Sequence, residues 1–118
     1  TTRMVADRNS ALVAGFYATD WAAPITFAGY CEGLKDWDVR AIVRDDEVIG
    51  AAYTREGEVH VSILPRWRKR WATKGLLRAL FDVEHPTTKV MPGHEYMYGI
   101  LTRLGFTHTG DGRFTKGH

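Results

Sequence analysis

Cysteine is nearly absent from this chain of 118 residues, which contains only Cys31. A lone cysteine excludes an intrachain disulfide and any zinc site built from paired cysteines. The five histidines form no H-x-x-x-H pair, so we expect no metal site. They are His60, His85, His94, His108 and His118. A reducing compartment such as the cytoplasm is the natural setting for such a chain.

Long apolar runs and a strong net charge are also missing. No run approaches the roughly 18 apolar residues of a membrane span, and no signal-like segment opens the chain, so we expect no membrane partner. The formal net charge is only +2, from 16 basic and 14 acidic side chains. The chain as a whole is therefore not a strongly cationic nucleic-acid binder.

The hydrophobic content is sufficient for one compact domain. Apolar residues make up 44% of the chain, and aromatic residues make up 12%. A chain of this length and composition can bury a core of its own. We therefore expect a single domain over residues 1–118, without a linker or tail.

The first half of the sequence predicts a strand, two helical regions and three consecutive antiparallel strands. Asp7, Asn9 and Ser10 are capping candidates for the first helix. Two apolar runs then flank the acidic turn at residues 45–47, as expected for a hairpin, and apolar residues alternate with others along residues 58–64. The expected strands span residues 3–6, 39–44, 48–53 and 58–64, and the expected helical regions span residues 11–17 and 21–37.

The second half predicts two helices, one more strand and a final hairpin. Apolar residues recur at helical spacing in two stretches, and each gives one stripe that can pack on a sheet. Gly105 ends the second stretch, and Gly110-Asp111-Gly112 turns the hairpin. The expected helices span residues 72–83 and 97–104, and the expected strands span residues 87–91, 106–109 and 113–116. Together the two halves predict an α/β fold.

Five basic residues lie in the loop that joins the strand at 58–64 to the next helix. They are Arg66, Arg68, Lys69, Arg70 and Lys74, and they follow Pro65. A helix start offers free backbone N–H groups and the positive end of a dipole, so a cationic loop there attracts phosphate. Such a patch also suits nucleic acid or an acidic protein face, and its simplest interpretation is a solvated loop.

This strand, proline, loop and helix resemble motif A of the GNAT superfamily of N-acetyltransferases. In that motif a strand ends near a proline, and Q/R-x-x-G-x-G/A opens a helix with paired leucines. Arg68 falls on the first motif position, and Leu76-Leu77 falls on the leucine pair. Trp71 replaces the first motif glycine, and Thr73 replaces the final glycine or alanine. Glycine there lets backbone N–H groups approach pyrophosphate closely, so Trp71 bears directly on coenzyme A binding.

A second segment, residues 94–106, is similar to the late family pattern N-x-x-A-x-x-x-Y-x-x-x-G-F. Its ending, Leu104-Gly105-Phe106, matches the pattern. His94 replaces the asparagine, and Leu101 stands where many members carry a tyrosine that protonates the leaving thiolate. Tyr98 lies one helical turn earlier and is the candidate substitute.

The resemblance implies an α/β (α+β) fold with a mixed, mostly antiparallel central sheet flanked by helices. It also implies acetyl-CoA as co-substrate, with strand backbone along the pantetheine arm and the basic loop at the pyrophosphate. The implied strand residues are Ser62, Ile63 and Leu64. The implied loop residues are Arg68, Lys69, Arg70, Trp71, Ala72, Thr73 and Lys74.

Acetyl transfer to an amine requires a base that leaves the amine neutral. His60 is the first candidate, because a histidine side chain exchanges its proton near neutral pH. Glu58 shares the strand face of His60 by period-two alternation, and Tyr98 is the candidate acid. Each also has a simpler interpretation, as a half-exposed strand histidine, a solvated glutamate and a packing aromatic.

The sequence leaves three functions open. The first is a GNAT-type acetyltransferase that moves an acetyl group from acetyl-CoA to a small-molecule or protein amine. The second is a catalytically degenerate GNAT-fold protein, such as a phage component in a host cytoplasm or virion, that has a structural role or binds a protein partner through the basic loop. The third is a nucleic-acid-binding module in which Trp67 and Trp71 stack on bases. The third is the lesser option, because no RNA-binding signature accompanies these residues.

Overall fold

The computed structural model describes residues 2–19, 24–91 and 94–117. Its strands are β1 (Thr2–Val5), β2 (Asp38–Arg44), β3 (Glu47–Arg55), β4 (Glu58–Ile63), β5 (Thr87–Lys89), β6 (Thr107–Gly110) and β7 (Arg113–Thr115). Its helices are α1 (Arg8–Ala18), α2 (Phe27–Gly33), α3 (Lys74–Leu80) and α4 (Met97–Arg103), with a 3-10 turn over Pro65–Trp67.

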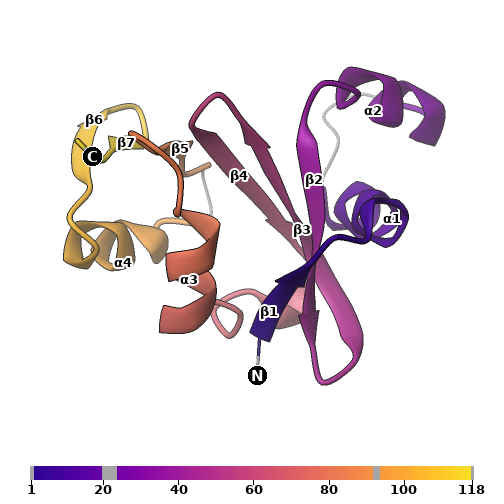
Figure 1. The fold of residues 1–118 in the computed structure, drawn as a ribbon, viewed down its shortest axis with the longest axis horizontal. Helices are drawn as coiled ribbons and strands as arrows, with labels where there is room; N and C mark the ends of the chain where they lie inside the picture. The colour runs from indigo at the N-terminus through magenta and orange to yellow at the C-terminus, as the bar shows by residue number, and fades with distance from the viewer. Residues whose placement is uncertain (1, 20–23, 92–93, 118) are drawn as a thin grey trace.

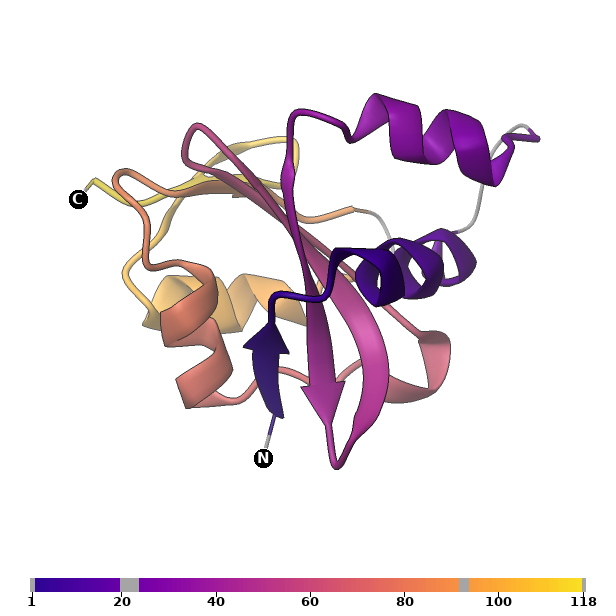
Figure 2. The ribbon, with the colours of Figure 1, turned by 45° about the vertical axis from the view of Figure 1, so that its right-hand side comes forward.

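The strands form one seven-stranded sheet in the order β1-β2-β3-β4-β5-β7-β6. All neighbours are antiparallel except β4 and β5, which are parallel. Figures 1 and 2 show α1 and α2 on one side of strands β2 to β4, and α3 and α4 on the other. The expected α/β fold, with a mixed and mostly antiparallel sheet flanked by helices, is confirmed. Residues 21–23 of the expected irregular helical region lie outside the described residues.

Thr73 sets the start of α3. Its hydroxyl accepts a hydrogen bond from the backbone N–H of Leu76 at 3.2 Å, which satisfies one of the free donors of the first helical turn. Ala72 therefore stays in the loop, and Phe81 closes the helix at its other end. As a result α3 is shorter than the predicted stretch 72–83, and the loop that precedes it is longer.

The core has two parts, one on each face of the sheet. The larger part lies against α3 and α4 and includes Ile42, Ile49, Val59, Trp71, Leu76, Leu77, Leu80, Leu101 and Phe114. The smaller part lies beneath α1 and α2 and includes Ala11, Leu12, Tyr30, Val39, Ala41, Ala51 and Tyr53. Strand β4 separates the two, since Val59 and Ile63 join the larger part while the alternate residues His60 and Ser62 face the side of α2.

A pair of tyrosine hydroxyls is buried in the smaller part of the core. The hydroxyls of Tyr30 and Tyr53 lie 2.5 Å apart, and Tyr30 is only 7% exposed. Gly15 on α1 makes room for them, because a methyl group there would lie 2.0 Å from the Tyr53 hydroxyl. Burial, followed by the hydrogen bond to Tyr53, raises the pKa of Tyr30 above the ordinary range of tyrosine.

We expect this tyrosine pair to make the fold sensitive to alkali. The folded protein keeps the proton of Tyr30, whereas the unfolded chain loses it above about pH 10, so stability is complete below that pH and falls above it. One such proton costs about 1.4 kcal/mol for each further pH unit. Urea unfolding at about pH 9 and about pH 11 should therefore show a smaller loss for Tyr30→Phe than for the wild type. The matched control is Tyr17→Phe, because Tyr17 is 74% exposed, and an equal effect of both changes would contradict this prediction.

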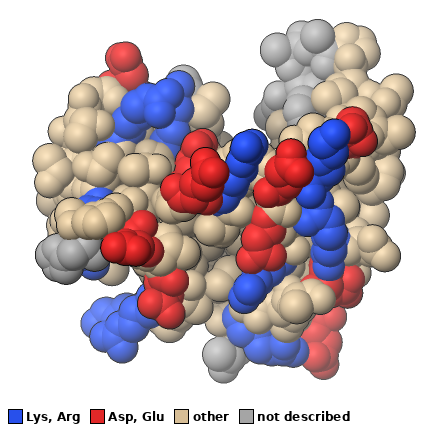
Figure 3. All heavy atoms as spheres, turned by 45° about the horizontal axis from the view of Figure 1, so that its top comes forward, with Lys and Arg blue, Asp and Glu red and all other residues tan. Residues whose placement is uncertain are grey.

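Charges of both signs are mixed on the surface shown in Figure 3. Acidic and basic side chains lie next to one another across the middle of that face, so neither sign dominates it. A nucleic-acid-binding face usually carries a basic stripe. The view therefore gives the nucleic-acid hypothesis no support from this face.

Candidate functional site

Strands β4 and β5 are neighbours at one end only. Their parallel pairing has a single register pair, Glu58 with Thr87, and Figure 1 shows β4 running away from β5 beyond it. At the far end of β4, the N–H of Leu64 donates to the carbonyl of Ile49 on the β3 side at 2.9 Å. Successive residues of a strand direct their backbone groups to alternate edges. Val61 and Ile63 therefore direct theirs toward the side of β5.

The result is a short open sheet edge inside the protein. Among the described strands, none pairs with Val61 or Ile63 on that side. An extended chain that carries amide groups, such as a pantetheine arm, can pair with such an edge as an added strand. Of the three residues predicted to align the arm, only Ile63 lies on this edge, since Ser62 and Leu64 direct their backbone groups to β3. Val61 was missed, although counting the alternation along the hairpin would have found it.

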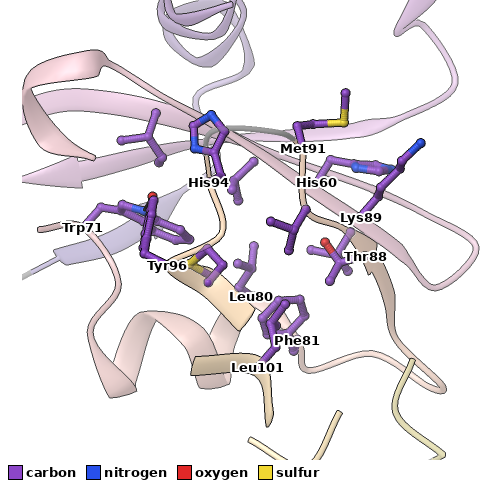
Figure 4. A pocket seen from close by; sticks show the side chains of 15 residues that line it. His60, Trp71, Leu80, Phe81, Thr88, Lys89, Met91, His94, Tyr96 and Leu101 are labelled. Atoms are coloured by element: carbon purple, nitrogen blue, oxygen red, sulfur yellow. Dashed lines mark hydrogen bonds between the residues drawn. The ribbon is translucent and has the colours of Figure 1, made fainter. Parts of the chain in front are cut away.

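A cavity of about 130 Å³ lies beside this edge. Its floor is apolar and includes Val59, Leu80, Phe81 and Leu101, whereas its rim carries His60, Thr88, Lys89, His94 and Tyr96. In Figure 4, Thr88 and Lys89 lie on one side and Trp71 and Tyr96 on the other. Since one water takes about 30 Å³ of liquid, the cavity has the room of roughly four waters. This space suits an acyl group and the end of the chain that carries it.

Trp71, which stands at the first motif glycine, points into the core and not into the loop. It is 1% exposed, and its indole Nε1 donates to the hydroxyl of Tyr96 at 3.1 Å. This hydrogen bond joins the loop after β4 to the segment before α4. The outer face of the loop is therefore backbone and not indole, and the side chain of Trp71 forms one wall of the cavity.

Three arginines of the basic loop, Arg66, Arg68 and Arg70, contact other parts of the protein. Arg68 donates to the carbonyl of Ala18 at 3.0 Å and to that of Ile63 at 3.3 Å. Arg66 forms an ion pair with Glu47, and Arg70 lies 4.6 Å from the ring centre of Trp67.

Lys69 and Lys74 are exposed, and no described residue forms an ion pair with either of them. Lys69 adopts the left-handed conformation, with φ of 71°. These two lysines are the cations that the loop leaves for an anion.

Backbone donors lie beside these lysines. In the described part of the chain, no backbone carbonyl accepts from the N–H of Ala72, Lys74 or Gly75. Gly75 has open space where a Cβ would stand, so a phosphate can approach the backbone there. The segment thus keeps the donors that the motif requires, although its glycines are at different positions.

His60 and Glu58 lie together on β4. The imidazole Nε2 of His60 is hydrogen-bonded to the carboxylate of Glu58, and 34% of the His60 side chain is exposed. When Nε2 donates to the carboxylate, Nδ1 keeps a free lone pair and can accept a proton. The predicted pair of neighbours therefore has the geometry of a base and the group that orients it.

His60 also borders a second hollow, on the opposite face of the sheet. This groove of about 370 Å³ lies beside α2, and Trp37, Tyr53 and Ser62 are among the residues that line it. The ring centre of Trp37 lies 5.7 Å from that of His60. His60 is thus among the residues that line both the cavity and the groove. Trp37 was not singled out from the sequence, because only the folded chain brings it to β4.

Tyr98 lies away from this site. Its ring packs against His108 and Phe114, with ring centres 5.1 Å apart in each case, and it does not line the cavity. The tyrosine that does line the cavity is Tyr96, which sequence reasoning missed. Its signal was weak, since Tyr96 comes before the helical stripe of α4 and matches no position of the family pattern.

Within residues 2–19, 24–91 and 94–117, no three histidine, cysteine, aspartate or glutamate residues form a group that could hold a metal ion. Among the same residues, every helix is too short or too polar to cross a membrane.

Solved structures share this fold. A ribosomal-protein-S18-alanine N-acetyltransferase from Escherichia coli superposes with a TM-score of 0.65 at 14% identity, over 98% of this chain and 89% of that one. A GCN5-related N-acetyltransferase from Rhodopseudomonas palustris superposes with a TM-score of 0.67 at 12% identity, over 100% of this chain and 95% of that one. An N-acetyltransferase from Staphylococcus aureus Mu50 superposes with a TM-score of 0.67 at 13% identity, over 93% of this chain and 86% of that one.

These likenesses show that the chain has the GNAT fold. No family model matches the sequence, and no curated protein matches it either. The sequence is therefore strongly divergent within a fold whose outline is complete. Identities of 12–14% establish the arrangement of the elements and not the reaction.

Proposed function

From this GNAT fold we propose that the protein is an N-acyltransferase that moves an acetyl group from acetyl-CoA to an amine. The observation that carries the proposal is the position of His60, which borders both the cavity beside β5 and the groove beside α2. A base between a donor pocket and an acceptor pocket stands where the amine loses its proton.

The residues around the cavity fit the donor. The edge at Val61 and the N–H of Ile63 would pair with the amides of the pantetheine arm, because an unpaired strand edge takes an extended chain. The carbonyl of Ile63 is already an acceptor for Arg68. The N–H groups of Ala72, Lys74 and Gly75 and the ammonium groups of Lys69 and Lys74 would hold the pyrophosphate. Arg68 would support this site from behind by holding the end of β4 against α1.

The chain's own side chains then supply the proton transfers. When bound, the thioester provides an activated acyl group with sulfur as the leaving atom. Nδ1 of His60 takes a proton from the amine, because Glu58 holds the proton of Nε2. The hydroxyl of Tyr96 is the donor for the leaving thiolate, since it lines the cavity. The hydrogen bond from Trp71 keeps that hydroxyl in place.

One observation favours a second candidate function. The indole of Trp71 stands at a motif glycine position and forms one wall of the cavity. A protein of this fold that had lost catalysis would be a scaffold that binds an acidic protein face through Lys69 and Lys74. The two functions differ in whether acetyl-CoA binds.

Isothermal titration with acetyl-CoA and with coenzyme A tests the proposal. We expect micromolar binding that weakens about tenfold in Lys74→Glu, because reversing one charge at the pyrophosphate costs at least about 1.4 kcal/mol. The matched control is Arg78→Glu, which makes the same charge change at an exposed position one turn later on α3. Absence of binding at millimolar ligand would reject the acyltransferase and favour the scaffold.

A further inference from the structure

Among the described residues, the groove beside α2 has a lining without acidic or basic residues other than His60, and three of these ten lining residues are tyrosine or tryptophan. Its volume of about 370 Å³ lies at the low end of the roughly 300–1,000 Å³ of small-molecule pockets. Its walls include Ile25, Tyr30, Leu34, Trp37 and Tyr53. None of the described lining residues is an aspartate, glutamate, lysine or arginine. The groove therefore suits a small apolar molecule.

The hydroxyl groups of the groove are largely engaged within the protein. Tyr30 and Tyr53 bond to each other, so their rings present apolar faces. Thr19 donates to the carbonyl of Gly15 at 2.9 Å. The hydroxyl of Ser62 lies 3.5 Å from that of Thr19, so the imidazole of His60 is the polar group best placed to meet a ligand. A ligand with one small polar group beside an apolar ring matches this arrangement.

A positively charged side chain, that of Arg8, contacts the backbone of two residues that line the groove. The guanidinium group of Arg8 donates to the backbone carbonyls of Trp37 and Leu34, each at 2.7 Å. The carboxylate of Glu58 is already bound to His60. A cationic ammonium group would meet no carboxylate among the described lining residues and would feel the charge of Arg8.

Of the three carboxylates that flank the groove between residues 32 and 38, two are paired, and the third, that of Asp36, is exposed and does not line the groove. Glu32 forms an ion pair with Lys35 at 3.0 Å, and Asp38 forms one with Arg40 at 3.0 Å. A protonated alkylamine, which needs a carboxylate or a set of acceptors, is therefore a poor match for this groove.

We propose that the acceptor is an arylamine, a primary amine attached to an aromatic ring and neutral near pH 7. The inference rests on the proposed function and specifies its acceptor. The ring lies among Tyr30, Leu34 and Trp37, and the amino group lies at His60. An arylamine needs no carboxylate in the groove, because it enters without a charge.

The group transfer balances with the residues present. The nitrogen lone pair forms a bond to the acyl carbon, and the bond between that carbon and sulfur breaks with its electron pair going to sulfur. Nδ1 of His60 takes the proton that nitrogen releases, and the thiolate takes a proton from Tyr96. Exchange with water restores both side chains. The products are an N-aryl amide and a free thiol.

Two probes of one size and different charge test the inference. These are 4-methylaniline, which is neutral at pH 7, and 4-methylcyclohexylamine, which is protonated there. With acetyl-CoA as donor and release of free thiol as the signal, we expect kcat/KM to be at least tenfold higher for 4-methylaniline. An equal or reversed preference in the wild-type protein would overturn the inference.

A carboxylate placed in the groove should change the preference. In Leu34→Asp the ratio of the two kcat/KM values should fall at least tenfold, because the cationic amine gains a partner. Leu34→Asn is the matched control, since asparagine has nearly the same shape as aspartate without the charge. Its ratio of the two kcat/KM values should stay within about threefold of the wild-type ratio. An unchanged ratio in Leu34→Asp would overturn the placement of the amine.

Failure of this inference can be separated from failure of the proposed function. If acetyl-CoA binds and is consumed faster with 4-methylcyclohexylamine, the proposed acyltransferase function is supported and the arylamine acceptor is rejected. If acetyl-CoA binds to neither the wild-type protein nor any variant, binding of each amine to the groove is measured by NMR. The signal followed during the titration is that of the indole N–H of Trp37. The groove assignment is supported if this signal saturates at a tenfold lower concentration of 4-methylaniline than of 4-methylcyclohexylamine. It is overturned if the two amines saturate the signal at the same concentration.

Discussion

Replacing Trp71 by alanine is expected to lower the free energy of unfolding by about 3–5 kcal/mol. The side chain is 1% exposed and is among the largest of the fully buried side chains. Alanine would leave a cavity between the sheet and α3 and would remove the hydrogen bond to Tyr96. Urea unfolding of the two proteins at neutral pH measures the difference.

Trp67 provides the control for this prediction. It lies in the same loop but is only partly buried, with the guanidinium groups of Arg44 and Arg70 at 5.4 and 4.6 Å from its ring centre. Since cation–π contacts at exposed sites contribute about 0.5–1 kcal/mol, Trp67→Ala should cost far less than Trp71→Ala. A loss below about 1 kcal/mol in Trp71→Ala, together with tighter acetyl-CoA binding, would show that the indole is a plug across the donor cavity.

The departure from the motif at this position is therefore a matter of packing. Restoring glycine at position 71 would remove the same buried indole and should destabilise the fold about as much as alanine does. The backbone donors that matter for an anion lie later, at Ala72, Lys74 and Gly75, where the side chain of Trp71 does not reach the outer face. A tryptophan at a motif glycine is thus compatible with the fold because it turns inward.

Local patterns predicted the hairpins of the sheet well. Strands β2 and β3 are apolar runs on either side of a short acidic turn, and β4 alternates apolar and polar residues after a second short turn, so each pairing follows from nearby residues. The separation of β4 from β5 could not be predicted in this way. The two strands are far apart in sequence and share a single register pair, so no local pattern sets where they meet and where they part.

The candidate site was predicted in its residue types more than in its geometry. His60 and Glu58 were expected on one face because alternation along a strand is regular. Arg68 was expected at the pyrophosphate because it falls on the first position of the motif that the sequence resembles. Its bonds to the carbonyls of Ala18 and Ile63 depend on where α1 ends in space, and no local pattern carries that information.

Replacing His60 by glutamine is expected to slow acetyl transfer by about 10²–10⁴-fold, which is the usual contribution of a positioned general base. Glutamine keeps a polar side chain of similar size but cannot take the amine proton. Because the His60 side chain is 34% exposed, the free energy of unfolding should change by less than about 1 kcal/mol. The affinity for acetyl-CoA should not change either, so the loss should fall on the rate constant measured with saturating donor.

Two further variants decide what a slow His60→Gln protein means. Glu58→Gln keeps a group next to Nε2 but removes the charge that orients the imidazole, so we expect a smaller loss than in His60→Gln. His108→Gln is the matched histidine control, because His108 stacks on Phe114 and does not line the cavity, and it should keep the wild-type rate. Equal losses in the His60 and His108 variants would indicate a general structural effect. An unchanged rate in His60→Gln would show that water or the substrate itself removes the proton, and the position of His60 between the two hollows would then have no catalytic meaning.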